Sequence, residues 1–457
     1  MHPITRHILT IPAQNGKGSR KVHYRRCGSG PALLMVHQSP RSSAEYAALM
    51  QQWGEHFTCI APDTPGFGQS DPLPGEPEIA EFADALCEFL DALGVGQVPA
   101  YGFHSGGIIL VTALKRQPHR FACLAVGGYA IWTEEEMRIF GTRYLPEFHP
   151  SDYGEHLTWL WNRMLEQSWV FPWFDTREDA RLSVAHADVA RVAQAVSEML
   201  DAGNAYRAGY GAVLRAPRDI PPADAPPETG NWPPCLITAY DGDPLQAHID
   251  RLGHMPAGWR AEKVRSPADH QAASLAFLQD HVDDAACPEL AENADEGWLS
   301  LDGGLIHWKG TKGGSLILHG PAEQMCEPGE GDIAIDVPGH GQSDAFDDAK
   351  AAVDSAASAL GASDIVWPSP PAGDPNHLYP DMTPDRFGEY LQRAWAVARA
   401  EAFFQPWYEA SAANAIPLDP ARLDPAALHA RALARIRAGD AARRWHETLL
   451  NLDGAPR

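Results

Sequence analysis

Two side chains in the hexapeptide GFHSGG could attack an electrophilic carbon, those of His104 and Ser105. The hexapeptide joins one apolar stretch, VPAY, to another, IILVTAL, so the pattern predicts a sharp turn from a strand into a helix. Such a turn strains the backbone of its tip residue, and side chains flanking the tip would collide across the turn. With His104 at the tip, the positions two residues away are Gly102 and Gly106, whereas with Ser105 at the tip one of them is Phe103. The glycine spacing therefore predicts His104 at the tip.

A histidine at this position has its own chemistry. Imidazole titrates near neutral pH and is a competent nucleophile and general base. The neighbouring hydroxyl of Ser105 could in addition donate a hydrogen bond to a bound substrate. The alternative that stays open is an inert turn from which the nucleophile has been lost.

The segments around the hexapeptide alternate between strand and helix patterns. PALLMVH (31–37) and FTCIAPD (57–63) are nearly continuous apolar runs, which predict buried parallel strands. Residues 77–94 have the spacing of an amphipathic helix. CLAVGG, CLITAYD and AEKVRS continue the strand series further along the chain. This alternation predicts an α/β fold with a doubly wound, mostly parallel sheet.

Residues 133–215 interrupt the alternation with a helical segment that contains the aromatic run WLWNRMLEQSWVFPWF. Ligands bind at the carboxyl edge of open α/β sheets, so we expect this insertion to form a helical cap over that edge. Arg41, after the first parallel strand, could bind a substrate carboxylate or form a salt bridge. The candidate contacts to a bound molecule are Gln38, Ser39, Arg41, His149, His156 and Tyr206.

A weaker copy of the same pattern follows. APDTPGFGQSD (61–71) recurs as AIDVPGHGQSD (334–344), with Ala, Asp, Pro, Gly, Gly, Gln, Ser and Asp identical, and two cap segments recur in the same order. The second copy has no counterpart of GFHSGG, YDGDP or DHQ. We therefore expect an α/β domain at 1–285, a linker at 286–297 and a truncated, degenerate repeat with its own cap at 298–457.

Composition limits the classes of partner. The net charge of −24 disfavours binding to nucleic acid or to an anionic membrane surface, and no apolar stretch is long enough to span a bilayer. The seven cysteines contain no CxxC motif, which argues against a disulfide framework and against a zinc site. We expect a cytoplasmic protein without metal or cofactor that binds a small molecule and could form a homo-oligomer.

The order of the motifs, HQSP, then PGFGQSD, GFHSGG, a helical insertion, YDGDP and DHQ, resembles the α/β-hydrolase superfamily with a helical cap. Epoxide hydrolases, haloalkane dehalogenases and C–C hydrolases are such proteins. The resemblance implies that Asp243 is the catalytic acid and His270 the base. It also implies an oxyanion hole formed by the backbone N–H groups of Ser105 and Gln38. The histidine at the nucleophile position departs from the family pattern.

The resemblance implies hydrolysis of an ester or a related carbonyl-centred bond in a small, partly apolar molecule held under the aromatic cap. The reaction would use either an acyl-imidazole at His104 or a water activated by it. One alternative is a lyase or dehydratase in which His104 and His270 act as acid and base. The other is a non-catalytic pseudo-hydrolase that binds a ligand or has a structural role.

Overall fold

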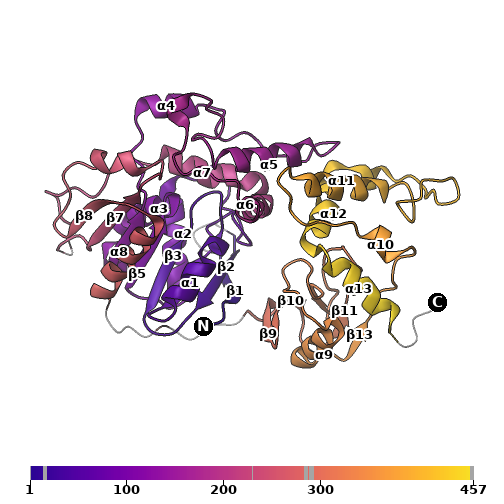
Figure 1. Ribbon diagram of the computed structural model, residues 1–457. Helices are drawn as coiled ribbons and strands as arrows, with labels where there is room; N and C mark the ends of the chain where they lie inside the picture. The colour runs from indigo at the N-terminus through magenta and orange to yellow at the C-terminus, as the bar shows by residue number, and fades with distance from the viewer. Residues whose placement is uncertain (1, 14–17, 229, 283–286, 288–292, 453–457) are drawn as a thin grey trace. The chain divides into compact units, whose positions relative to one another are not determined.

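The computed structural model describes residues 1–457 except 1, 14–17, 229, 283–286, 288–292 and 453–457 (Figure 1). The chain forms two compact units. The first comprises Met1–Phe148 and Arg163–Glu292, and the second comprises His149–Asn162 and Asn293–Arg457. No helix in the described part of the chain is both long enough and apolar enough to cross a membrane.

The first unit is built on a sheet with the strand order β1-β2-β4-β3-β5-β6-β7-β8. β2 pairs antiparallel with β1 and β4, and all other pairs are parallel. This sheet confirms the predicted α/β class. The strands are β1 (Thr5–Ile11), β2 (Arg20–Cys27), β3 (Ala32–Val36), β4 (Thr58–Pro62), β5 (Val98–Phe103), β6 (Phe121–Gly127), β7 (Cys235–Tyr240) and β8 (Trp259–Val264).

Helices cover both faces of this sheet, as a doubly wound fold requires. Along β3, Leu34 and Val36 pack into one apolar core, and Leu33 and Met35 pack into the other. Successive side chains of a strand point to opposite faces, so a strand buried on both sides must be apolar throughout. The helices around the sheet are α1 (Ala47–Trp53), α2 (Ile79–Ala92), α3 (Ser105–Arg116), α7 (Tyr206–Arg215) and α8 (Pro267–Asp280).

The predicted cap at 133–215 contains α4 (Glu134–Phe140), α5 (Glu155–Glu166) and α6 (Val189–Ala202), followed by α7. This segment is divided between the two units, because residues 149–162 pack with the second one. Within the second unit, the indole of Trp161 donates to the carbonyl of Arg386 at 3.1 Å and lies edge-on to Tyr390. Residues 155–162, the first two thirds of α5, therefore belong to the second unit and not to the first domain as expected.

The second unit has a sheet with the order β13-β11-β12-β10-β9. Read from its other edge, this order and its pairing directions equal those of β1-β2-β4-β3-β5. The predicted repeat requires this order, and the repeat itself stays a prediction. The elements are β9 (Glu296–Leu301), β10 (Gly304–Gly310), β11 (Ser315–Ile317), β12 (Ile333–Ile335), α9 (Ala349–Leu360), β13 (Asp364–Val366), α10 (Pro375–Leu378), α11 (Glu389–Ala400), α12 (Pro425–Ala438) and α13 (Ala441–Leu450).

Half of the predicted linker at 286–297, residues 286 and 288–292, lies outside the described residues. Its last two positions belong to β9, which begins at Glu296. The first strand of the second unit therefore begins two residues before residue 298, the predicted start of the repeat.

Candidate active site

His104 lies at the tip of the turn between β5 and α3, with φ 47° and ψ −111°. An added Cβ on Gly106 would lie 1.9 Å from the carbonyl oxygen of Val36, and one on Gly102 would lie 2.8 Å from the backbone carbonyl carbon of Gly106. Both approaches are closer than carbon atoms tolerate, so only glycine fits at the two flanking positions. The backbone places His104 where the glycine spacing predicts it.

The imidazole of His104 contacts the carboxylate of Asp243, which follows β7. Its Nε2 lies 3.1 Å from Oδ1 and 3.2 Å from Oδ2. The Asp243 side chain is fully buried, and its Oδ1 also accepts the N–H of Leu245 at 2.8 Å. Burial raises the pKa of Asp243, but the charge and hydrogen bond of His104, together with the Leu245 N–H, outweigh it and hold the pKa below its usual value. Asp243 is therefore an ionised partner for the histidine.

A second glycine contact keeps this pair together. Gly128, just after β6, has φ 58°, and an added Cβ there would lie 2.6 Å from His104 Nε2 and 2.8 Å from Asp243 Oδ2. On the other side, the His104 ring stacks on Phe103 with 4.2 Å between ring centroids. The histidine is thus held between an aromatic ring and a bare backbone.

The structure does not bring His270 to this pair. His270 lies in the first turn of α8, 2% exposed, with Nε2 2.8 Å from the Tyr101 hydroxyl and Nδ1 2.5 Å from the Thr238 hydroxyl. Burial lowers the pKa of His270 to about 4, and the charge of His104 adds to this effect although Asp243 opposes it. Both ring nitrogens are occupied by hydroxyl groups, so His104 makes the contact with Asp243 that the resemblance implied for His270.

The expected oxyanion hole differs from the observed contacts. The Gln38 N–H donates to Glu45 Oε1 at 2.9 Å, and the Gln38 side-chain amide donates to Oε2 of the same carboxylate at 3.1 Å. Ser105 begins α3, and its hydroxyl oxygen accepts the N–H of Ser39 at 2.5 Å. Of the two expected backbone donors, the one from Gln38 is therefore already engaged by the chain. No sequence signal pointed to Glu45.

Arg41 is paired with a carboxylate of the protein. Its Nε and Nη2 donate to the two oxygens of Glu198 at 2.7 and 3.1 Å, and the N–H of Ser42 donates to the same group at 2.8 Å. Of the two predicted roles, the structure therefore has the salt bridge, in a buried form. Glu198 lies on α6 among the buried positions Val196 and Met199, and a charged residue on an apolar helix face was a usable signal for this pair.

The three candidate contacts from the cap, His149, His156 and Tyr206, are not among the residues that line the cavity beside His104. His149 is exposed and belongs to the second unit. In that unit the buried His156 contacts His429, with Nε2 and Nδ1 3.0 Å apart. Tyr206 is fully buried in the first unit, and its hydroxyl donates to the carbonyl of Pro146. Of the three, His156 and Tyr206 are therefore in packing positions, and His149 is on the surface.

The cavity beside His104 has a volume of about 390 Å³. Among its polar lining residues are Gln38, Ser39, Arg41 and Ser105. Its apolar walls come from β5, from the segment after β6 and from the cap and α7, and include Phe103, Trp132, Phe171, Val192, Tyr210 and Leu214. Within the described ranges, no three or more His, Cys, Asp or Glu side chains are arranged to hold a metal ion. The site is a mostly apolar chamber with a few polar groups at the turn.

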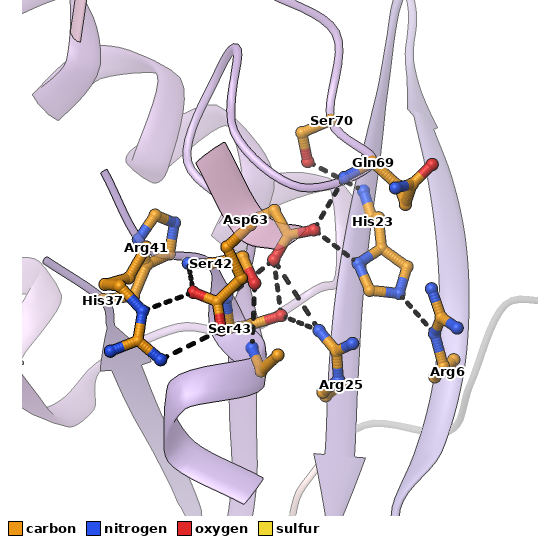
Figure 2. A network of polar contacts seen from close by, with 12 residues as sticks. Arg6, His23, Arg25, His37, Arg41, Ser42, Ser43, Asp63, Gln69 and Ser70 are labelled. Carbon is orange, nitrogen blue, oxygen red and sulfur yellow. Dashed lines mark hydrogen bonds and ion pairs between the residues drawn. The ribbon is translucent and has the colours of Figure 1, made fainter. Parts of the chain in front are cut away.

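The segment APDTPGFGQSD, which contains Asp63, supports the loops around the site. Figure 2 shows the carboxylate of Asp63 accepting the His23 ring Nδ1–H at 2.7 Å, the N–H and hydroxyl of Ser43 at 2.8 and 2.5 Å, and the N–H of Gln69 at 2.9 Å. Gly68 permits this network, because an added Cβ would lie 1.9 Å from Asp63 Oδ2. Burial opposes ionisation of Asp63, but its partners hold the pKa well below the usual range.

The same network recurs in the second unit. His307 contacts Asp336 at 2.8 Å, and the Gln342 N–H donates to the same carboxylate at 2.9 Å. The shared motif therefore has a shared structural role, which explains why it appears in a segment without a counterpart of GFHSGG.

Comparisons with known proteins agree with this architecture. Residues 31–145 match a family model described as alpha/beta hydrolase fold. Haloalkane dehalogenase 2 of Mycobacterium tuberculosis is 30% identical over 120 residues, which is 26% of this chain and 42% of that protein. (E)-2-((N-methylformamido)methylene)succinate hydrolase of Acinetobacter baylyi is 28% identical over 97 residues, or 21% of this chain and 36% of that protein. This chain therefore spans less than half the length of these curated relatives.

Among solved structures, a thermophilic esterase from Thermogutta terrifontis is 18% identical, with a TM-score of 0.41, and the match covers 61% of this chain and 99% of that one. The family match and the observed sheet together define the class. The first unit has an alpha/beta hydrolase fold, and its residues 31–145 are similar to that family.

Proposed function

We propose that the protein is a hydrolase in which His104 and Asp243 form a catalytic dyad acting on an ester or related carbonyl-centred bond. One observation carries this proposal. A histidine at the strained turn contacts a fully buried, ionised carboxylate and opens into an apolar cavity. Such a pairing is the base–acid half of a serine-hydrolase triad, moved onto the turn itself.

The dyad supports the activation of water. With Nε2–H donating to Asp243, the lone pair of the ring is on Nδ1, which is the nitrogen that accepts a proton from water. The carboxylate of Asp243 then stabilises the positive charge that develops on the imidazole. The same lone pair could attack the carbonyl directly and form an acyl-imidazole, which would appear as a mass adduct in a rapidly quenched reaction.

Stabilisation of the oxyanion falls to Ser105 in this proposal. The Gln38 N–H is taken by Glu45, whereas the Ser105 hydroxyl uses its oxygen to accept from Ser39 and keeps its hydrogen for a ligand. The Ser105 N–H at the start of α3 adds a second donor from the same residue. Ser105 is thus proposed as a hydrogen-bond donor and His104 as the reactive residue.

The cavity supports a small, partly apolar substrate. Its volume of about 390 Å³ is within the usual range for small-molecule sites, and its walls are rich in aromatic and aliphatic side chains. Arg41 is neutralised by Glu198, so a carboxylate on the substrate is not part of the proposal.

A lyase or dehydratase is the second candidate. The observation in its favour is the engaged Gln38 N–H, which leaves fewer donors for an oxyanion than acyl transfer normally uses. In this case His104 would act as the base with Asp243 alone, because His270 is held by two hydroxyl groups.

The test compares H104A, S105A and the control H254A with the wild-type protein on a panel of p-nitrophenyl esters, together with a fluorophosphonate probe and intact mass. His254 is exposed and does not line the cavity, so its removal tests for unspecific loss of a histidine. We expect turnover that is lost in H104A, reduced in S105A and retained in H254A, without probe labelling. Labelling that disappears only in S105A would overturn the dyad, and wild-type turnover retained in H104A would do the same.

A further inference from the structure

The second unit contains a cavity of its own, with a volume of about 420 Å³. Pro321 and Ala322 line it just after β11, as Ser39 and Pro40 line the first cavity just after β3. The other walls come from α10, α12 and the segment 401–407 after α11. The second unit therefore keeps a chamber at the corresponding edge of its sheet, although the catalytic turn is missing from it.

Three guanidinium groups line this cavity, those of Arg422, Arg431 and Arg435. Arg435 is only 5% exposed, and its Nη2 donates to the carboxylate of Glu401. Arg422 donates to the backbone carbonyl of Glu401 at 2.9 Å, and Arg431 donates to the backbone carbonyl of Arg422. Among the described contacts of these three arginines, the one to a carboxylate is that of Arg435, and Arg422 and Arg431 donate to backbone carbonyls.

The cluster has more donors than the protein satisfies. Within the described part of the chain, the buried Nε atoms of Arg431 and Arg435 have no hydrogen-bond partner. Buried donors without partners are costly and are rare in native proteins unless a ligand satisfies them. These two Nε atoms have almost no accessible surface, so they show that the guanidinium cluster is incompletely satisfied, although the Nε–H groups themselves do not face the cavity.

The charges of the lining residues also favour a ligand in this cavity. Glu323 and Glu401 are the acidic residues among the lining side chains, against the three arginines, which leaves a surplus of one positive charge. Glu323 already accepts the Gly320 N–H at 3.0 Å. Burial lowers the pKa of Arg431, and the charges of Arg422 and Arg435 lower it further while Glu401 opposes them. A monoanion in the cavity would complete the charge balance.

We propose that the cavity of the second unit binds a small organic carboxylate with an apolar body. The planar fork of a guanidinium matches a carboxylate, and Arg422, Arg431 and Arg435 all line the cavity. Apolar wall residues would enclose the rest of the molecule, and these are Leu378, Phe404, Pro406, Trp407 and Ala434. The apolar walls and the single surplus charge favour a carboxylate over inorganic phosphate. The proposal does not depend on catalysis at His104, because none of these residues lies in the first unit.

The test is calorimetric titration of the full chain with phenylacetate, its neutral analogue 2-phenylethanol and inorganic phosphate. We expect phenylacetate to bind, and to bind at least tenfold more tightly than either comparison compound, since loss of a charged hydrogen-bond pair costs about this factor or more. Equal or tighter binding of phosphate would overturn the organic part of the proposal, and equal binding of the alcohol would overturn its charged part. No binding of phenylacetate would overturn it as a whole.

Variants locate the binding in the second unit. R431Q and, as a second removal of a lining guanidinium, R422Q should each weaken phenylacetate binding at least tenfold. The control R444Q makes the same change at an exposed position of α13 outside the lining and should bind as the wild type does. Each variant is first required to keep the circular dichroism spectrum of the wild type. Unchanged binding of phenylacetate by folded R431Q and R422Q would overturn the proposal. We expect H104A to bind phenylacetate as the wild type does, which distinguishes this cavity from the one beside His104.

Discussion

Replacement of Asp243 by asparagine is the sharpest test of the dyad. The substitution keeps the shape of the side chain and removes its negative charge. At the observed separation of 3.1 Å, a carboxylate and a protonated imidazole attract each other by about 5 kcal/mol if the effective dielectric constant is about 20. Each 1.4 kcal/mol, approximately, corresponds to a factor of ten in rate, so kcat/KM of D243N should fall by about 10³-fold or more.

The assay is steady-state hydrolysis of the ester that the wild-type protein turns over best. D241N is the matched control, because Asp241 is an exposed neighbour whose carboxylate accepts the side-chain amide of Gln246 at 2.7 Å. We expect kcat/KM of D241N to stay within tenfold of the wild type. A value for D243N that also stays within tenfold would refute the proposed role of the carboxylate.

A second measurement on D243N does not depend on the substrate. Nitrogen NMR of the His104 ring should show the proton on Nε2 in the wild type, where Nε2–H donates to the carboxylate of Asp243. In D243N the amide can donate as well as accept, so the population with the proton on Nδ1 should rise. An unchanged tautomer would contradict the contact on which the mechanism rests.

Three further predictions concern stability, measured by urea unfolding. G68A should lower the free energy of unfolding by about 3 kcal/mol, because the added Cβ would collide with Asp63 Oδ2. The control G75A has φ 70° and open space around it, so it should lower the free energy of unfolding by only about 1 kcal/mol, the cost of its backbone conformation. Equal losses in the two variants would refute the role given to the Asp63 network. E198Q should cost about 3 kcal/mol because it leaves a largely buried guanidinium without its carboxylate, and a loss below about 1 kcal/mol would show that this pair behaves as a surface ion pair. The folded-state pKa of His270 is lowered to about 4, so its protonation favours the unfolded chain, and the free energy of unfolding falls as the pH drops from about 6.5 toward 4. H270Q should reduce this fall by up to about 3 kcal/mol. An unchanged pH dependence of stability in H270Q would contradict the assignment of this pKa to His270.

Much of the first unit could be predicted from local sequence patterns. PALLMVH and FTCIAPD form β3 and β4, because an apolar run of this length is stable only as a strand covered on both faces. The position of His104 could also be predicted, since backbone atoms of Val36 and Gly106 approach the flanking positions too closely for any residue but glycine. These are short-range steric and periodic constraints, and they leave a visible trace in residue type and spacing.

The contacts of the candidate site required the tertiary structure. Whether Asp243 meets His104 or His270 depends on how the ends of β5, β7 and α8 converge, and the hydroxyl groups of Tyr101 and Thr238 decide it by binding both nitrogens of His270. No spacing rule relates residues so far apart in the chain.

The sequence by itself thus determined the α/β class of the protein and which residue stands at the strained turn, because both follow from the space that a backbone leaves to its own neighbours. The tertiary structure decided which partners that residue has. The carboxylate of Glu45 engages the Gln38 N–H, and the carboxylate of Glu198 engages Arg41. Pairing of buried charges and donors is settled only when distant segments are brought together and water is removed from between them.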